Sequence, residues 1–129
     1  MYGRDDVEWR DLIDVGTAFL DERARLGKTT TYTEMNAVLQ RRTGLRPFDF
    51  EQASERAAMG YLLGTIVEGD YPTRGYMLSA LVLYLNGNDP GSGFYALAAQ
   101  MGLLSPNGDK LAFWMEQLNG VYARRGAGP

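Results

Sequence analysis

The start of the chain repeats its apolar residues with the period of an α-helix. The repeat consists of Trp9, Leu12, Ile13, Gly16, Phe19 and Leu20. Acidic residues precede it, which suits the positive end of a helix dipole, and Gly27 follows it as a helix terminator. We therefore predict an acidic N-terminal helix over about 6–26.

A shorter apolar repeat follows a β-prone stretch. Residues 28–32, KTTTY, favour either an edge strand or the lead-in to a helix. The apolar positions of the helix that follows are Met35, Val38 and Leu39. Thr31 or Thr33 is its expected N-cap, and we predict that it ends near Gly44.

The third helix, expected over about 51–68, has two unlike faces. Its apolar side carries Met59, Leu63 and Ile66. The other side, which we call the small-residue face, consists of Ala53, Ser54, Ala57, Gly60, Tyr61 and Gly64. Small side chains let another backbone come close, and that backbone belongs either to the same chain or to a partner. We place internal packing, for example against Gly16 and Ala18 of the first helix, ahead of partner contact.

The pattern changes after the third helix. Residues 76–85, YMLSALVLYL, form a continuous apolar run that predicts a strand over 77–85 covered on both faces. The glycine-rich residues after it predict a turn. Helices over about 94–104 and 109–124 complete the pattern. Residues 1–129 are therefore expected to form a single α+β, helix-rich domain with about five helices and a small two- or three-stranded sheet.

The composition removes several kinds of chemistry. The chain has no cysteine and no histidine, which excludes disulfides, thiolate metal sites and cysteine nucleophiles and removes the commonest general base. We therefore expect a non-enzymatic protein with no catalytic residue, no metal site and no cofactor. The longest apolar run is about half a membrane span, and the acidic start is unlike a signal peptide. A cytoplasmic protein without a membrane partner is expected.

Two glycine-containing stretches match ligand-binding loops only in part. GSGFYA, residues 91–96, has the glycine spacing of a dinucleotide loop, but helices follow it in place of a second parallel strand. NGNDPG, residues 86–91, begins like a calcium loop, but Pro90 stands where a ligand belongs. We interpret both stretches as turns.

Charged residues are segregated along the chain. Residues 1–22 contain two basic and seven acidic residues, a net charge of −5, whereas residues 23–46 contain six basic residues and one acidic residue, a net charge of +5. The remaining residues carry −3. The basic segment (residues 23–46) faces either an anionic partner or the acidic helix of the same molecule, and the sequence leaves both open.

The small-residue helix and its flanks carry a family resemblance. Thr31 and Tyr32 open one helix, Arg56-Ala57-Ala58-Met59-Gly60 lies on the next, and a strand over 77–85 leads into the glycine-rich NGNDPGSGF. This arrangement, over roughly residues 28–104, resembles the winged-helix domain of the O6-alkylguanine DNA alkyltransferases and alkyltransferase-like proteins. The Pro-Cys-His-Arg motif of that family is missing, and YMLSALV stands in its place. The resemblance therefore implies the DNA-binding scaffold without alkyl transfer.

In that family the small-residue helix enters the minor groove of DNA. By position, the resemblance implies that Arg56 enters the groove or the base stack and that Tyr32 contacts a phosphate. The other nucleic-acid-binding residues that we predict are Arg41, Arg42 and Arg46, which attract phosphates, and Ser54, Ala57 and Gly60 on the small-residue face. The acidic residues on and just before the third helix repel DNA phosphates and so oppose this contact.

Two functions remain. We predict a winged-helix-like, non-enzymatic binding protein and place double-stranded DNA first as its partner. The alternative is an adaptor or inhibitor that binds an unidentified protein. Such a protein could form a homodimer through the first helix or through the small-residue face. The choice depends on the basic segment: if the acidic N-terminal helix neutralises it, the adaptor is favoured.

Overall fold

The computed structural model describes residues 1–85 and 89–125. Within them the chain forms five α-helices, one 3₁₀ helix and two short strands. Their bounds are α1 Asp6–Arg25, β1 Thr30–Thr31, α2 Tyr32–Thr43, α3 Ala53–Arg74, the 3₁₀ helix η1 Leu78–Leu81, β2 Val82–Leu83, α4 Ser92–Gln100 and α5 Lys110–Arg125. The expected helix-rich α+β architecture with a small sheet is confirmed. None of the helices in the described residues combines the length and apolar character that crossing a membrane requires.

The first two helices begin and end as predicted, because their caps are local. The Asp5 side chain accepts a hydrogen bond from the Glu8 backbone N–H (2.8 Å), and the Glu8 carboxylate accepts one from the Asp5 N–H (2.9 Å). Thr31 is the N-cap of α2 and accepts from the Glu34 N–H (3.0 Å). Gly44 ends α2 in the left-handed conformation, with φ 73°.

α3 is longer than the predicted helix. It continues through residues 69–74, beyond the predicted end near residue 68. Pro72 in this stretch removes one helical hydrogen bond. Tertiary contacts offset that loss, because Tyr71 packs on the core and Asp70 forms an ion pair with Arg125 of α5. The end of α3 is therefore stabilised by other elements rather than by local preference.

The predicted strand over 77–85 is wrong for most of its length. η1 takes its place, and only β2 is extended, pairing in parallel with β1. The register is Thr30 with Val82 and Thr31 with Leu83. Every residue over 77–83 is buried, and an unbroken apolar run has no period by which helix and strand can be told apart. Residues 28–32 contain both expected features, because β1 is a strand paired with β2 and Thr31 at its end is the N-cap of α2.

The two C-terminal helices lie close to their predicted positions. α4 begins after Gly91, where φ is 90°, and ends before Gly102, where φ is 76°. It therefore stops short of the predicted residue 104. In both places a glycine adopts a backbone conformation that other residues avoid, and so sets the boundary.

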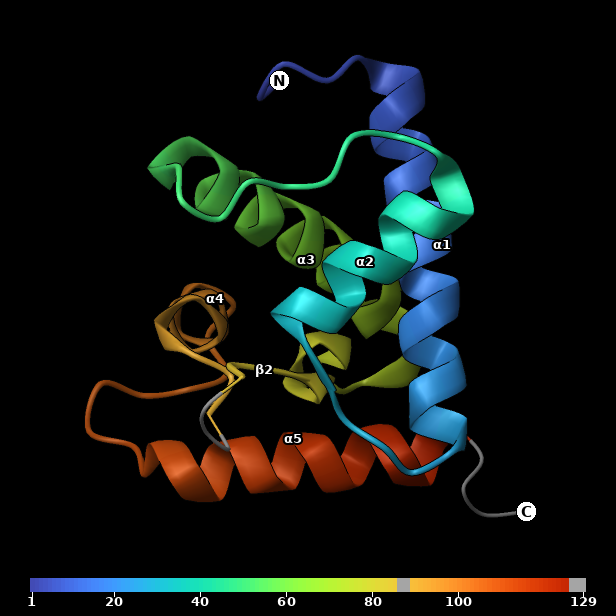
Figure 1. Ribbon diagram of the computed structural model, residues 1–129. Helices are drawn as coiled ribbons and strands as arrows, with labels where there is room; N and C mark the ends of the chain where they lie inside the picture. The colour runs from blue at the N-terminus through green and yellow to red at the C-terminus, as the bar shows by residue number, and fades with distance from the viewer. Residues whose placement is uncertain (86–88, 126–129) are drawn as a thin grey trace.

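η1 lies at the centre of the molecule and the long helices surround it. α1, α3 and α5 pack against η1, and α2 packs against α1 (Figure 1). Fully buried side chains come from these elements, among them Leu12, Leu20, Met35, Leu62 and Leu78. α4 stands off from α3 (Figure 1) and contacts α5 through Phe94, whose ring centroid lies 5.9 Å from that of Phe113.

Candidate binding groove beside α3

The small-residue face of α3 is open to solvent. The exposed residues are Ala53, Ser54, Ala57, Gly60 and Tyr61, and Gly64 is half-buried. A Cβ atom added at Gly60 or Gly64 meets no neighbouring atom of the described chain within 4 Å. The expectation that this face packs against another helix of the chain is therefore wrong for its small residues and holds only at its edge, where the Tyr61 ring packs on Trp9 of α1 with ring centroids 4.8 Å apart. α1 approaches the apolar side of α3 instead, where a Cβ at Gly16 would lie 3.0 Å from Ile66 Cδ1.

A cavity of about 1080 Å³ opens beside this face, between α3, α4 and the end of β2. We call it the α3–α4 groove. Its lining includes Arg56, Ala57, Gly60, Gly64 and Glu68 from α3, Ser92, Gly93, Ala96 and Leu97 from α4, and Tyr32 and Tyr84 from the flanking segments. The core residues Met59, Leu63 and Phe94 also line it. The groove is a concave surface with an apolar floor.

Ser79 of η1 places an unpaired polar atom in that floor. The residue is 5% exposed, and its Oγ has no hydrogen-bond partner in the described part of the chain. The adjacent Ala80 carbonyl oxygen, by contrast, accepts from Trp114 Nε1 at 2.9 Å. Because buried hydroxyls normally have a partner, the floor offers an unused hydrogen-bonding group to whatever occupies the groove.

Tyr32 lies at the groove with its hydroxyl engaged. The hydroxyl donates to the Pro90 carbonyl oxygen at 2.8 Å, and the ring centroid lies 5.1 Å from that of Tyr84. Burial, followed by the nearby Tyr84 and Asp89, raises the pKa of Tyr32 well above its ordinary value, so the phenol stays protonated. A phosphate contact at Tyr32, as the family resemblance implies, requires the bond to Pro90 to open.

Arg56 is the predicted DNA-binding arginine that lines the groove. Its Nη1 donates to the Phe50 carbonyl oxygen at 2.6 Å. It forms no ion pair with any carboxylate in the described residues. The structure thus brings Arg56 together with Tyr32, Ala57 and Gly60, whereas Ser54 is exposed on the same face without lining the groove.

Much of the basic segment is paired with acids of the same molecule. Arg42 donates two hydrogen bonds to Glu22 of α1, at 2.7 and 3.3 Å, which lower the pKa of Glu22 and raise that of Arg42. Arg25 Nη2 lies 2.6 Å from Asp21 Oδ2 of the same helix. Arg41 forms no ion pair in the described residues. Arg42, predicted to attract phosphates, therefore faces the acidic helix.

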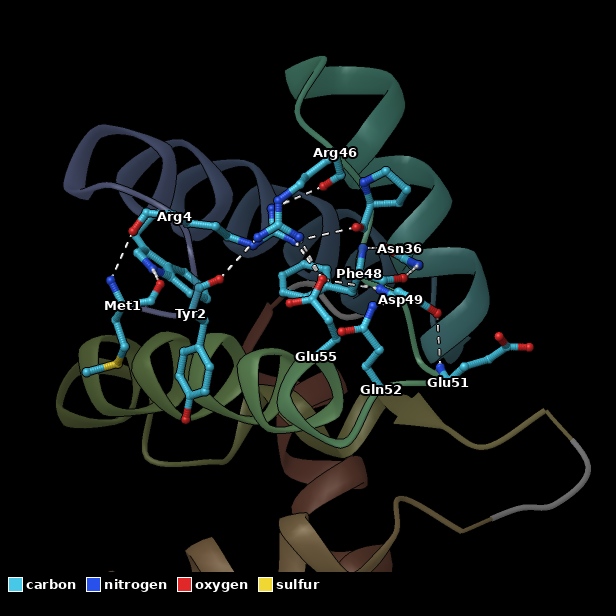
Figure 2. Close-up of polar contacts among 12 residues, drawn as sticks. Met1, Tyr2, Arg4, Asn36, Arg46, Phe48, Asp49, Glu51, Gln52 and Glu55 are labelled. Carbon is cyan, nitrogen blue, oxygen red and sulfur yellow. Dashed lines mark hydrogen bonds and ion pairs between the residues drawn. The ribbon is translucent and has the colours of Figure 1, made fainter.

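Arg46 belongs to a separate ion cluster centred on Glu55 (Figure 2). Glu55 Oε1 accepts from Arg46 Nη1 at 2.8 Å and from Arg4 Nη2 at 3.4 Å. The Arg4 guanidinium lies 4.2 Å from the centroid of the Phe48 ring, and its burial, followed by the charge of Arg46, lowers the pKa of Arg4. Arg46 therefore joins the N-terminal segment to the start of α3, but it shares the one Glu55 carboxylate with Arg4, so the cluster keeps a net charge of +1.

Sequence reasoning missed the α4 side of the groove and its floor. Ser79 is the one serine in the apolar run over 76–85, and that position was a usable signal. Gly93, Ala96 and Leu97 carry no such signal, because their place in the groove depends on α4 standing apart from α3.

No family model, curated protein or solved structure matches the chain. The resemblance to the alkyltransferase winged-helix domain therefore rests on the residues quoted for it. The function is inferred from the geometry of the groove.

Proposed function

We propose that the chain is a non-enzymatic cytoplasmic protein that binds another protein in the α3–α4 groove. The observation that carries this proposal is the exposed small-residue face, which forms one wall of a concave surface with an apolar floor. Contiguous exposed apolar surface is typical of an interaction site. Small residues on both helical walls leave room for a helix of the partner, as in helix-in-groove recognition.

Side chains around the groove also support a protein partner. Tyr61 and Tyr84 line it while remaining 37% and 53% exposed, and Arg56 lines it too. Tyrosine and arginine are enriched where proteins bind proteins. Within the described residues, no serine of the groove is hydrogen-bonded to a general base, which supports binding rather than nucleophilic catalysis.

Filling the groove tests the proposal. Gly60→Arg places a long charged side chain on the groove wall, while Gly69→Arg makes the same change on the same helix outside the groove. At both positions the described residues place no atom within 4 Å of the Cβ site, and arginine has a higher helix propensity than glycine. At protein concentrations too low for self-association, both variants should therefore melt no lower than the wild type, and only Gly60→Arg should lose the protein partner.

The measurement is affinity capture from extracts of cells that express the protein, quantified by mass spectrometry. The expected result is a protein retained by the wild type and by Gly69→Arg but lost from Gly60→Arg. Capture of the same proteins at the same level by all three chains would contradict the proposal.

Binding of double-stranded DNA by a winged-helix-like domain is the second candidate. The exposed small-residue face beside Arg56 favours it. We rank it below protein binding because Arg42 and Arg46 are paired with acids, which leaves less positive charge for phosphates. The glycine-rich wing implied over 86–94 lies partly outside the described residues. A mobility-shift assay on short duplexes at low salt separates the candidates. If the chain does not shift the duplexes at low salt, the DNA-binding candidate is rejected.

A further inference from the structure

We infer that the protein received by the groove is a second copy of this chain, with the two α3 helices antiparallel about a two-fold axis between Gly60 and Gly64. This rests on the proposed function, because it names the partner of the same groove. The shape of α3, its charges and the floor of the groove each support it.

The small-residue face is symmetric about its own middle. Gly60 and Gly64 lie two residues on either side of position 62, and a Cβ atom at either glycine has no neighbour within 4 Å among residues 1–85 and 89–125. In an antiparallel pair centred on position 62, Gly60 of each copy lies opposite Gly64 of the other. Interaxial distance depends on the side chains at the contact, so helices that cross at glycine approach closely.

The charges on the groove are complementary under the same axis. Arg56 and Glu68 both line it, six residues on either side of position 62. Neither forms an ion pair within the described residues. Antiparallel pairing brings Arg56 of each copy to the same height as Glu68 of the other, which makes two opposite-charge contacts about 18 Å apart along the helix.

The reverse orientation is disfavoured. Parallel pairing would set Arg56 beside Arg56 and Glu68 beside Glu68, and parallel helix dipoles would also oppose it. The antiparallel contact uses the same patch on both copies, which is the isologous form that a closed dimer requires.

The floor of the groove is incomplete without an occupant. Ser79 Oγ is buried there without a hydrogen-bond partner in the described residues, and the wall that α4 contributes consists partly of the exposed residues Ser92, Gly93 and Ala96. A second α3 across the groove covers the apolar lining and packs on the exposed side of α4. It also brings polar side chains of the second copy toward the Ser79 hydroxyl.

Charge reversal tests the pairing. The full chain is studied by sedimentation equilibrium over a dilution series, as wild type, Arg56→Glu, Glu68→Arg and the double variant. Each single reversal turns both contacts into like-charge pairs and should weaken the homodimer roughly tenfold or more. The double reversal restores opposite charges and should return the dimer to within about threefold of the wild type.

Mixing the two single variants makes the test sharper. Arg56→Glu carries two acidic ends and Glu68→Arg two basic ends, so the mixed dimer has two opposite-charge contacts although neither homodimer has any. We expect the mixture to associate about as strongly as the wild type. Gly69→Arg should remain dimeric and Gly60→Arg should be monomeric.

The inference is overturned by a dimer that the single reversals leave unchanged, or that neither the double variant nor the mixture restores. It is also overturned by a wild type that stays monomeric at the highest concentration. If the wild type stays monomeric, the capture experiment still tests the proposed function independently of the homodimer. A partner lost only from Gly60→Arg leaves protein binding standing with another occupant, and equal capture by all three chains rejects both.

Discussion

The hydroxyl of Ser79 lies among apolar core residues, and its Oγ makes no hydrogen bond within the described residues. Thr30 is also buried, but its hydroxyl donates a hydrogen bond to the Glu34 carboxylate. The two residues are therefore a matched pair, one hydroxyl without a partner and one with a partner. A buried polar group left unsatisfied costs roughly 1–3 kcal/mol.

We predict that Ser79→Ala raises the melting temperature of the monomer, because it removes the unsatisfied group without breaking a bond. Thr30→Val, which deletes a satisfied hydroxyl of similar shape, should lower it. Thermal unfolding at concentrations below the association range measures both. Equal destabilisation by the two variants would show that Ser79 Oγ has a partner in solution.

Among the elements, α1 and α3 use glycine in opposite ways. Gly16 allows close packing of the two helices, with Ile66 Cδ1 and Met35 Cε at 3.0 and 3.3 Å from its Cβ position, whereas Gly69 has no neighbour within 4 Å in the described chain. One glycine is required by a contact between helices, and the other is not.

Gly16→Val should therefore lower the free energy of unfolding by about 1–3 kcal/mol, because its branches overpack the contact between α1 and α3. Gly69→Val should change it by less than about 0.5 kcal/mol. Urea unfolding followed by far-ultraviolet circular dichroism compares them. A neutral Gly16→Val would mean that the Ile66 and Met35 side chains move away from the added methyl groups at no cost.

In the molecule as a whole, Arg125 of α5 joins three helices. Its side chain is 3% exposed and forms ion pairs with Asp21 of α1, at 2.5 Å, and with Asp70 of α3. Arg25 also pairs with Asp21, but its side chain is 63% exposed. The same aspartate thus has one buried and one solvated partner.

We predict that Arg125→Met lowers the free energy of unfolding by about 3–5 kcal/mol, because it leaves two carboxylates without their buried cation. Arg25→Met should cost at most about 1 kcal/mol, since water screens the exposed pair. Urea unfolding measures the difference. Similar values for the two variants would place Arg125 in a solvated position instead.

The sequence by itself determined the helix-rich class and the bounds of the first two helices. Asp5, Thr31 and Gly44 set those bounds through hydrogen bonds or backbone conformations that involve only residues within one turn. Such interactions are available to the chain before it folds, so the local pattern contains the information.

Only the tertiary structure decided which secondary structure the apolar run over 77–85 adopts, how long α3 is and whether its small-residue face is exposed. The helix continues through Pro72 because Asp70 forms an ion pair with Arg125, which is distant in sequence. Gly60 borders an open groove because α4 stands apart from α3. The pairing of Arg42 with Glu22 was decided in the same way. Burial and ion pairing depend on which distant segments come together, and a local pattern of residue types does not specify that.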